Sequence, residues 1–315
     1  MISRRDYLQL AALAGVSLAA APKALLAAEG GQRALITRTI PGTSERLPVI
    51  GLGSSASFSR IAGAGETAVI QKLLEHLAKI PNSVFDTAPS YGASEEVAAG
   101  VARTSGVNQK LFWATKVNVA GFGGSHADPK AARAQLDRSI ERLGKTPVDL
   151  IQVHNMGDVP TQLGLLKEYQ KAGRVRYVGV TTTFPQHYEQ LERVMREHEL
   201  NFIGVDYAID NRVMEERIFP LAQQRNIGVL AYQPFGRDRL WQKVKGHTVP
   251  EWAAEYDIAT WGQFFLKFAI SHPAVTVATP ATSNERNLID NLGAATGRLP
   301  DEKGRQRMIA HVESL

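Results

Sequence analysis

The sequence predicts an α/β fold, and specifically a (β/α)8 barrel with an N-terminal β-hairpin. Short apolar runs that are typical of buried strands alternate with amphipathic stretches that are typical of helices. The alternation repeats at a spacing of roughly 30 residues, which indicates parallel strands joined by helical crossovers. Eight such units within about 250 residues match the usual size of a closed barrel, and an open, doubly wound sheet is the competing architecture.

Each unit can be located in order along the chain. Residues 35–48 are expected to form the hairpin, with Pro41-Gly42 near its turn. Asp128-Pro129 is a typical start, and Gly144 a typical end, of the helix between them. The expected strands lie at 49–53, 83–86, 111–116, 148–154, 175–181, 202–206, 227–232 and 275–279. The expected helices lie at 66–80, 93–104, 129–143, 160–172, 186–198, 212–226, 260–271 and 284–296.

The first 28 residues are predicted to be a separate segment, which leaves 29–315 as a single domain. Ser3-Arg4-Arg5-Asp6-Tyr7-Leu8 places a basic pair before an apolar stretch that is too short to span a membrane comfortably, and small residues follow near Ala27-Ala28. This order resembles a twin-arginine export signal. The resemblance implies the twin-arginine machinery as a partner, a periplasmic location, and a mature chain without a membrane span. The alternative is an Ala-rich helix that remains attached.

Composition excludes several classes of site and partner. The chain contains no cysteine, so disulfides, zinc–thiolate sites, iron–sulfur clusters and cysteine nucleophiles are excluded, and no metal site is predicted. The net charge is +5 for the whole chain and about +3 once the first 28 residues are set aside. Because the charge is mild and no dense basic patch carries interleaved aromatic residues, nucleic acid is not expected as a partner.

Three successive predicted strands end on a residue with useful chemistry, namely Asp86, Lys116 and His154. Since the carboxyl ends of barrel strands form one mouth, these side chains are expected to meet there. A charge at the end of an apolar strand is costly unless it is paired, and Asp86 can pair with Lys116. Tyr91, in the loop after Asp86, can fold back over that pair.

These four residues suggest acid–base chemistry at a carbonyl group. A free tyrosine has a pKa of about 10, and a cation beside its oxygen lowers that pKa. We therefore expect Lys116, held by Asp86, to make Tyr91 a usable proton donor, while His154 orients the carbonyl. The alternative for each residue alone is structural: a turn residue, a solvated charge or a buried histidine. Trp113 lies an odd number of positions before Lys116, so it is expected to point outward and pack against the helices.

Several segments together resemble the signature of the aldo-keto reductase family, over residues 36–312. The resemblance implies a (β/α)8 barrel that binds NADP(H), with NAD(H) also possible, and moves a hydride between nicotinamide and a small carbonyl or alcohol substrate. It also implies that Asp86, Tyr91, Lys116 and His154 form the catalytic tetrad. The segments are Phe85-Asp86-Thr87-Ala88, Tyr91-Gly92, Ser94-Glu95-Glu96, Ala114-Thr115-Lys116, Val148-Asp149-Leu150 with His154, residues 173–180, Ala231-Tyr232-Gln233-Pro234, and residues 284–292.

The resemblance further implies a set of cofactor contacts, in which Tyr232 stacks on the nicotinamide and Arg286 lies near the 2′-phosphate. The full set is Ser54, Thr181, Thr182, Tyr232, Gln233, Phe235, Arg237, Thr282, Ser283, Arg286 and Asn291.

The chain departs from the family pattern at several of these contacts. The usual Ser-Asn pair after the fifth strand is Thr181-Thr182, and the usual Gln on the sixth strand is Gly204. The common Lys and Arg near the 2′-phosphate align with Ala281 and Asn287, so only a modest preference for NADP(H) is expected.

The remaining expectations concern substrate and function. An open substrate pocket is expected, lined by Phe58, Phe122 and Trp241. The expected activity is reduction of an aldehyde or ketone, or oxidation of the corresponding alcohol, with Tyr91 as the general acid. The alternative is a nucleotide-holding redox-sensing or partner-binding subunit with little or no turnover, which the altered carboxamide contacts favour.

Overall fold

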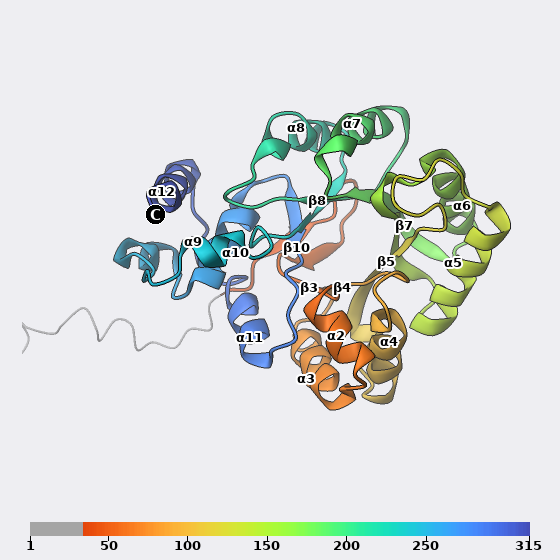
Figure 1. The fold of residues 1–315 in the computed structure, drawn as a ribbon, viewed down its shortest axis with the longest axis horizontal. Coiled ribbons are helices and arrows are strands. Elements are labelled where there is room, and N and C mark those ends of the chain that lie inside the picture. The colour runs from red at the N-terminus through yellow and green to blue at the C-terminus, as the bar shows by residue number, and fades with distance from the viewer. Residues whose placement is uncertain (1–33) are drawn as a thin grey trace, which may run out of the picture. The chain divides into compact units, whose positions relative to one another are not determined.

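The computed structural model describes residues 34–315, and Leu35–Leu315 form one compact unit. The predicted leader at 1–28, with its Arg4-Arg5 pair, lies outside the described residues. Eight parallel strands form one sheet whose spatial order follows the sequence (Figure 1). They are β3 (Leu52–Gly53), β4 (Ser83–Asp86), β5 (Leu111–Val117), β6 (Val148–Val153), β7 (Val175–Thr182), β8 (Phe202–Asp206), β9 (Gly228–Tyr232) and β10 (Val275–Ala278).

The sheet closes on itself. Isolated parallel bridges join Ile50 to Ala278 and Gly53 to Ala281, that is, the first strand to the last. Backbone hydrogen bonds support the closure, with Gly51 N donating to Ala278 O at 2.9 Å and Gly53 N to Pro280 O at 3.0 Å. The closed (β/α)8 barrel is thereby confirmed over the open, doubly wound sheet.

Helices alternate with the strands around the barrel (Figure 1). The eight expected helices are present, although the segment at 212–226 is a short 3-10 turn (Val213–Glu215) followed by α8 (Ile218–Gln224). The others are α3 (Thr67–Ala78), α4 (Ser94–Thr104), α5 (Pro129–Leu143), α6 (Val159–Lys171), α7 (Tyr188–Glu197), α10 (Trp261–Ser271) and α11 (Glu285–Gly293). Three additional helices were not expected: α2 (Ser57–Gly63), α9 (Arg239–Lys243) and α12 (Glu302–Glu313).

The boundaries of α5 show how the sequence sets a helix. Asp128 caps the helix by accepting a hydrogen bond from the backbone of Lys130, and Pro129 occupies the first turn, where it removes no helical hydrogen bond. Gly144 ends the helix in the left-handed conformation at a φ of 58°. Both predicted boundary signals are confirmed.

The predicted hairpin forms from β1 (Thr37–Thr39) and β2 (Arg46–Pro48), which pair antiparallel. Its Ile40 and Leu47 are fully buried among the side chains that fill the barrel, so the hairpin contributes to the floor of the interior. The interior cluster also contains Val84, Phe112, Ala114, Leu150, Phe202, Leu230 and Val277.

Strand alternation places a second layer of side chains above this cluster, at the carboxyl-end mouth. Because Val84 and Phe112 face the interior, Asp86 and Lys116 lie on the same face of β4 and β5. Trp113 instead belongs to the outer core, where it is fully buried and contacts the ring of Phe85. The predicted outward orientation of Trp113 is confirmed. Among the described residues, no helix is long and apolar enough to cross a membrane.

Candidate active site

A buried ion pair lies at the mouth of the barrel. The ammonium of Lys116, which is 1% exposed, donates to Oδ1 of Asp86 at 2.8 Å and to the backbone oxygen of Thr87 at 2.8 Å. Two buried charges remain in place only when they satisfy one another, so these strand ends fix the ammonium in one position.

Tyr91 and His154 complete the predicted group of four. The ammonium of Lys116 lies 5.0 Å from the centre of the Tyr91 ring. The imidazole of His154 meets that ring edge-on at a centroid distance of 5.6 Å. The Ser90 hydroxyl lies 3.3 Å from Nδ1 of His154, a contact that the sequence did not reveal. The structure thus brings all four predicted residues together.

The predicted direction of the Tyr91 pKa was wrong. Burial raises the pKa of Tyr91, and the charge of Asp86 raises it further. The charge of Lys116 lowers this pKa, but the net direction is upward from the ordinary value. The phenol is therefore protonated at neutral pH. Lys116 still makes Tyr91 a stronger acid than burial alone would allow.

The neighbouring groups respond to the same burial. Burial raises the pKa of Asp86 despite the opposing charge of Lys116. Burial lowers the pKa of Lys116, but Asp86 and Tyr91 raise that pKa by more, so Lys116 stays charged. Burial, together with the charge of Lys116, lowers the pKa of His154 to about 3. His154 is therefore a neutral imidazole at physiological pH.

Tyr232 extends the group across the barrel. Its hydroxyl donates toward Oδ2 of Asp86 at 3.0 Å and lies 3.1 Å from Oε1 of Gln152. Lys116 lies 5.5 Å from the centre of its ring. Gln152 is fully buried and was not predicted as a site residue. Its signal was available, since it lies two positions before His154 in an otherwise apolar run and so shares its face.

The two threonines after β7 differ in what their hydroxyls can reach. Thr181 is 2% exposed and accepts a hydrogen bond from the backbone of Asn155 at 3.3 Å. Thr182 is fully buried, and its hydroxyl contacts His187 at 3.2 Å and the backbone of Phe184 at 3.2 Å. Neighbouring strand residues face opposite sides, so the two hydroxyls point in different directions, and their contacts with a cofactor remain predictions.

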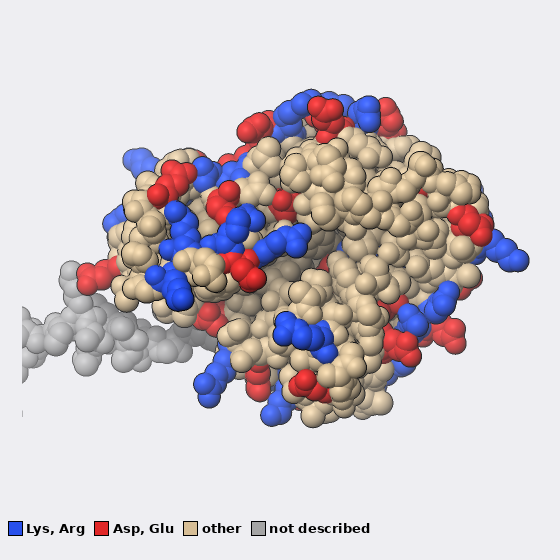
Figure 2. Space-filling model, viewed as in Figure 1, with Lys and Arg blue, Asp and Glu red and all other residues tan. Residues whose placement is uncertain are grey.

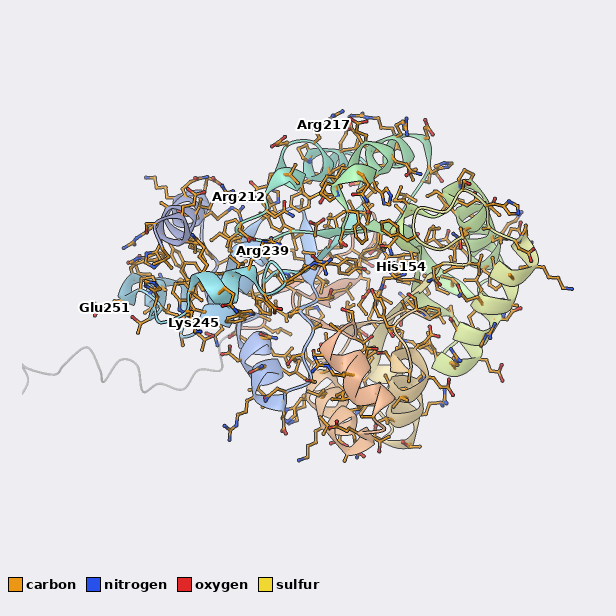
Figure 3. The ribbon with its side chains drawn as sticks, viewed as in Figure 1. His154, Arg212, Arg217, Arg239, Lys245 and Glu251 are labelled. Carbon is orange, nitrogen blue, oxygen red and sulfur yellow. The ribbon has the colours of Figure 1, made fainter. Side chains whose placement is uncertain are left out.

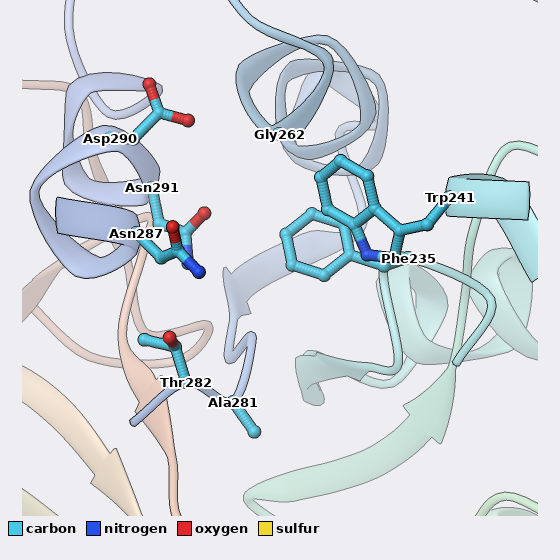
Figure 4. A pocket seen from close by; sticks show the side chains of 8 residues that line it. All are labelled: Phe235, Trp241, Gly262, Ala281, Thr282, Asn287, Asp290 and Asn291. Atoms are coloured by element: carbon cyan, nitrogen blue, oxygen red, sulfur yellow. The ribbon is translucent and has the colours of Figure 1, made fainter. Parts of the chain in front are cut away.

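A cavity of about 310 Å³ lies where α9, α10 and α11 meet (Figure 4). Asn287 and Asn291 on one side face the rings of Phe235 and Trp241 on the other, whose centroids are 5.0 Å apart. Gly262, Ala281, Thr282 and Asp290 complete the described lining. Of the predicted cofactor residues, Phe235, Thr282 and Asn291 meet here.

Three buried hydroxyls mark the rim between β10 and β4. Ser54, Thr87 and Thr279 follow β3, β4 and β10, which are neighbours in the closed barrel. Their hydroxyl oxygens have no hydrogen-bond partner within residues 34–315. Buried polar groups are nearly always paired, so this rim is suited to a polar ligand. Ser54 was predicted, whereas the two threonines were not.

Basic side chains gather beside the hollow in the barrel. Figure 2 shows Lys and Arg grouped to the left of this hollow, and Figure 3 labels Arg212, Arg239 and Lys245 on that side, with His154 to the right of centre. Arg239 pairs with Asp210 at 2.9 Å. The other predicted residues of this region remain predictions: Gln233 is partly buried, Arg237 exposed, Ser283 partly buried and Arg286 exposed, outside the cavity lining.

The predicted substrate residues are placed differently from one another. Phe58 is fully buried in α2 against Phe85 at 5.3 Å, so it cannot contact a substrate, and that prediction is corrected. Phe122 is 54% exposed and lies against Phe184 at 4.4 Å. Trp241 lines the cavity of Figure 4, beside residues predicted for the cofactor.

Comparison with known proteins places this geometry in a family. The chain is 26% identical over 256 residues to the probable aldo-keto reductase 1 of Glycine max, covering 70% of this chain and 73% of that protein. It is 24% identical over 293 residues to aldo-keto reductase str7 of Strobilurus tenacellus, covering 81% of this chain and 86% of that protein.

Solved structures share the fold. The aldo/keto reductase from Klebsiella pneumoniae in complex with NADP and acetate matches with a TM-score of 0.69 at 21% identity, covering 89% of this chain and 96% of that chain. A model of the aldo/keto reductase family matches residues 49–307, which is most of the sequence. The chain therefore belongs to the aldo/keto reductase family.

Proposed function

We propose that the protein is an NADP(H)-dependent oxidoreductase that interconverts an aldehyde or ketone and its alcohol, with Tyr91 as the general acid. The observation that carries this proposal is the Lys116 ammonium, held 2.8 Å from Asp86 and 5.0 Å from the centre of the Tyr91 ring, with His154 beside the same ring. A steady-state assay with an added aldehyde and NADPH tests it.

Tyr91, Lys116 and His154 have different roles in the proposed reduction. A bound reduced nicotinamide would supply the hydride. Tyr91 donates its proton to the oxygen on which negative charge develops, and Lys116 stabilises the phenolate that remains. His154 is neutral and carries one N–H. In the tautomer in which Nδ1 accepts from the Ser90 hydroxyl, that N–H lies on Nε2, where it can hold the carbonyl oxygen.

The chain's own residues fit a dinucleotide. The unpaired hydroxyls of Ser54, Thr87 and Thr279 offer hydrogen bonds beside the ion pair. The cavity of Figure 4 offers aromatic rings on one wall and amides on the other, which suits an adenine base. The basic side chains beside the hollow in the barrel suit a pyrophosphate. The Klebsiella pneumoniae structure with NADP supports the choice of cofactor.

We expect a preference for NADP(H) over NAD(H) that is real but modest. Arg286 is the predicted partner of the 2′-phosphate, and one such contact contributes about tenfold to a hundredfold in affinity. Asp290 lines the cavity and opposes a phosphate by its charge. Arg286→Ala should therefore bring the two cofactors close to parity, whereas Asp290→Asn should strengthen NADP(H) binding selectively.

Fluorescence titration of NADP(H) and NAD(H) against wild type, Arg286→Ala and Asp290→Asn measures these affinities. A preference of more than about a thousandfold that survives in Arg286→Ala would mean that another residue binds the phosphate.

A second candidate is a subunit that holds nucleotide and senses redox state or binds a partner. The observation that favours it is the altered region around the predicted carboxamide site, where Gly204 offers no side chain and the Thr182 hydroxyl is used within its own loop. The intact group of four favours the enzyme, because a nucleotide-holding subunit has no need of a proton donor.

We also propose export of the folded protein to the periplasm through the twin-arginine route. Support comes from the sequence alone, in the order of the basic pair, the apolar stretch and the small residues within 1–28. Charge-preserving Arg4→Lys with Arg5→Lys should leave the protein in the cytoplasm, folded and active, because the pair is read by a receptor. Cell fractionation measures this, with Lys23→Arg as the matched control. Periplasmic recovery of the double variant would contradict the proposal.

A further inference from the structure

Tyr232 and Gly204 form a matched pair on β9 and β8. A Cβ atom added to Gly204 would lie 2.4 Å from Cε2 of Tyr232 and 2.6 Å from its hydroxyl oxygen. Contacts of that length do not occur, so any other residue at 204 would displace the phenol. The absence of a side chain at 204 is thus what allows Tyr232 to reach across the mouth toward Asp86.

The contact completes the surroundings of the Asp86 carboxylate. Lys116 donates to Oδ1 at 2.8 Å and Tyr232 donates to Oδ2 at 3.0 Å, so each oxygen has its own donor. A phenol carries one proton and cannot donate to Gln152 at the same time. The carboxylate is the nearer acceptor and the charged one, so it receives the proton.

We propose that Tyr232 is a positioning residue that fixes the Asp86 carboxylate, and through it the ammonium of Lys116, beneath Tyr91. The geometry supports this because a carboxylate held by only one donor can rotate about its Cβ–Cγ bond, and the ammonium would then lose its fixed place. The role in catalysis rests on the proposed function, whereas the hydrogen bond to Asp86 does not.

The test follows the titration of Asp86 itself. The groups that face it are Lys116 from β5, Tyr91 from its own loop, and Tyr232 from β9, with His154 beyond Lys116. A donor to the charged carboxylate lowers its pKa, so removing the hydroxyl in Tyr232→Phe should raise the midpoint of Asp86, by about one pH unit. Carbon-13 NMR of labelled aspartate measures the midpoint, with the resonance assigned by its loss in Asp86→Asn.

Two further variants sharpen the result. Tyr169→Phe is the matched control, because Tyr169 also donates to a carboxylate, that of Asp137 at 2.8 Å, but between the outer helices. It should leave Asp86 unchanged. Gly204→Ala should displace the Tyr232 phenol and raise the Asp86 midpoint as much as Tyr232→Phe does. The double variant Gly204→Ala with Tyr232→Phe should raise that midpoint no further. This non-additivity would not arise from general loss of stability.

The acid limb of kcat/KM should move with the titration, to higher pH, in Tyr232→Phe and Gly204→Ala and not in Tyr169→Phe. The NMR titration needs neither cofactor nor turnover, so it still decides the hydrogen bond if no carbonyl is reduced. An Asp86 midpoint that is the same in wild type, Tyr232→Phe and Gly204→Ala would overturn the proposal.

Discussion

Tyr91→Phe is expected to lower the rate of carbonyl reduction by about 10²-fold to 10⁴-fold, the usual contribution of a general acid, while leaving nucleotide affinity nearly unchanged. The substitution removes one hydroxyl and keeps the ring against which His154 packs at 5.6 Å. The proton is needed only where charge develops on the substrate oxygen, so the loss should appear in kcat rather than in nucleotide binding. Stopped-time product assays and nucleotide titration measure the two quantities separately.

The matched control for this prediction is Tyr169→Phe, which also removes a phenol hydroxyl but lies at a distance from the mouth, between α5 and α6. It should reduce at the wild-type rate. If Tyr91→Phe and Tyr169→Phe were equally active, Tyr91 would have no part in proton transfer.

Lys116→Met should lower the rate at least as far and should also change its dependence on pH. Without the ammonium, the pKa of Tyr91 rises further above its ordinary value, because the charge that opposes burial is gone. The phenol becomes a weaker acid, so reduction slows, and the pH at which activity is lost on the basic side moves upward. The variant also leaves Asp86 buried without its partner, which costs about 3–5 kcal/mol of stability.

Two comparisons separate chemistry from folding in this prediction. Lys145→Met breaks a partly buried pair of the same kind, with Asp149 at 2.6 Å near the start of β6, and should leave the pH profile unchanged. Asp86→Asn combined with Lys116→Met removes both charges and should recover stability without activity. A normal rate and an unchanged pH profile in Lys116→Met would mean that Lys116 has only a structural role.

The barrel and the group of four were accessible to sequence reasoning for a shared reason. The periodicity of apolar residues and the position of strand ends are local properties of a sequence. The barrel then brings successive strand ends to one mouth. Asp86, Lys116 and His154 could therefore be placed together without knowing any distance. The outward orientation of Trp113 followed from the alternation of side chains along a strand.

Other properties of the site depend on packing that no local pattern encodes. The pKa of Tyr91 depends on the balance between burial and the charge of Lys116, which requires the finished structure. Phe58 became core because its segment folded as α2, a helix too short to give a periodic signal. The contact between Tyr232 and Asp86 joins residues 146 positions apart. It depends on a missing side chain at Gly204, which in the sequence alone appears only as a lost contact.

Hydride transfer to a carbonyl is tested most directly by transfer of deuterium from NADPH, labelled on the reduced nicotinamide, to an aromatic aldehyde by the purified protein. Mass spectrometry of the product measures it. We expect an alcohol with one deuterium on the former carbonyl carbon, formed by wild type and not, above background, by Tyr91→Phe. Wild-type protein that binds NADPH yet yields no labelled alcohol across a panel of aldehydes and ketones would contradict carbonyl reduction as the function and favour the nucleotide-holding subunit.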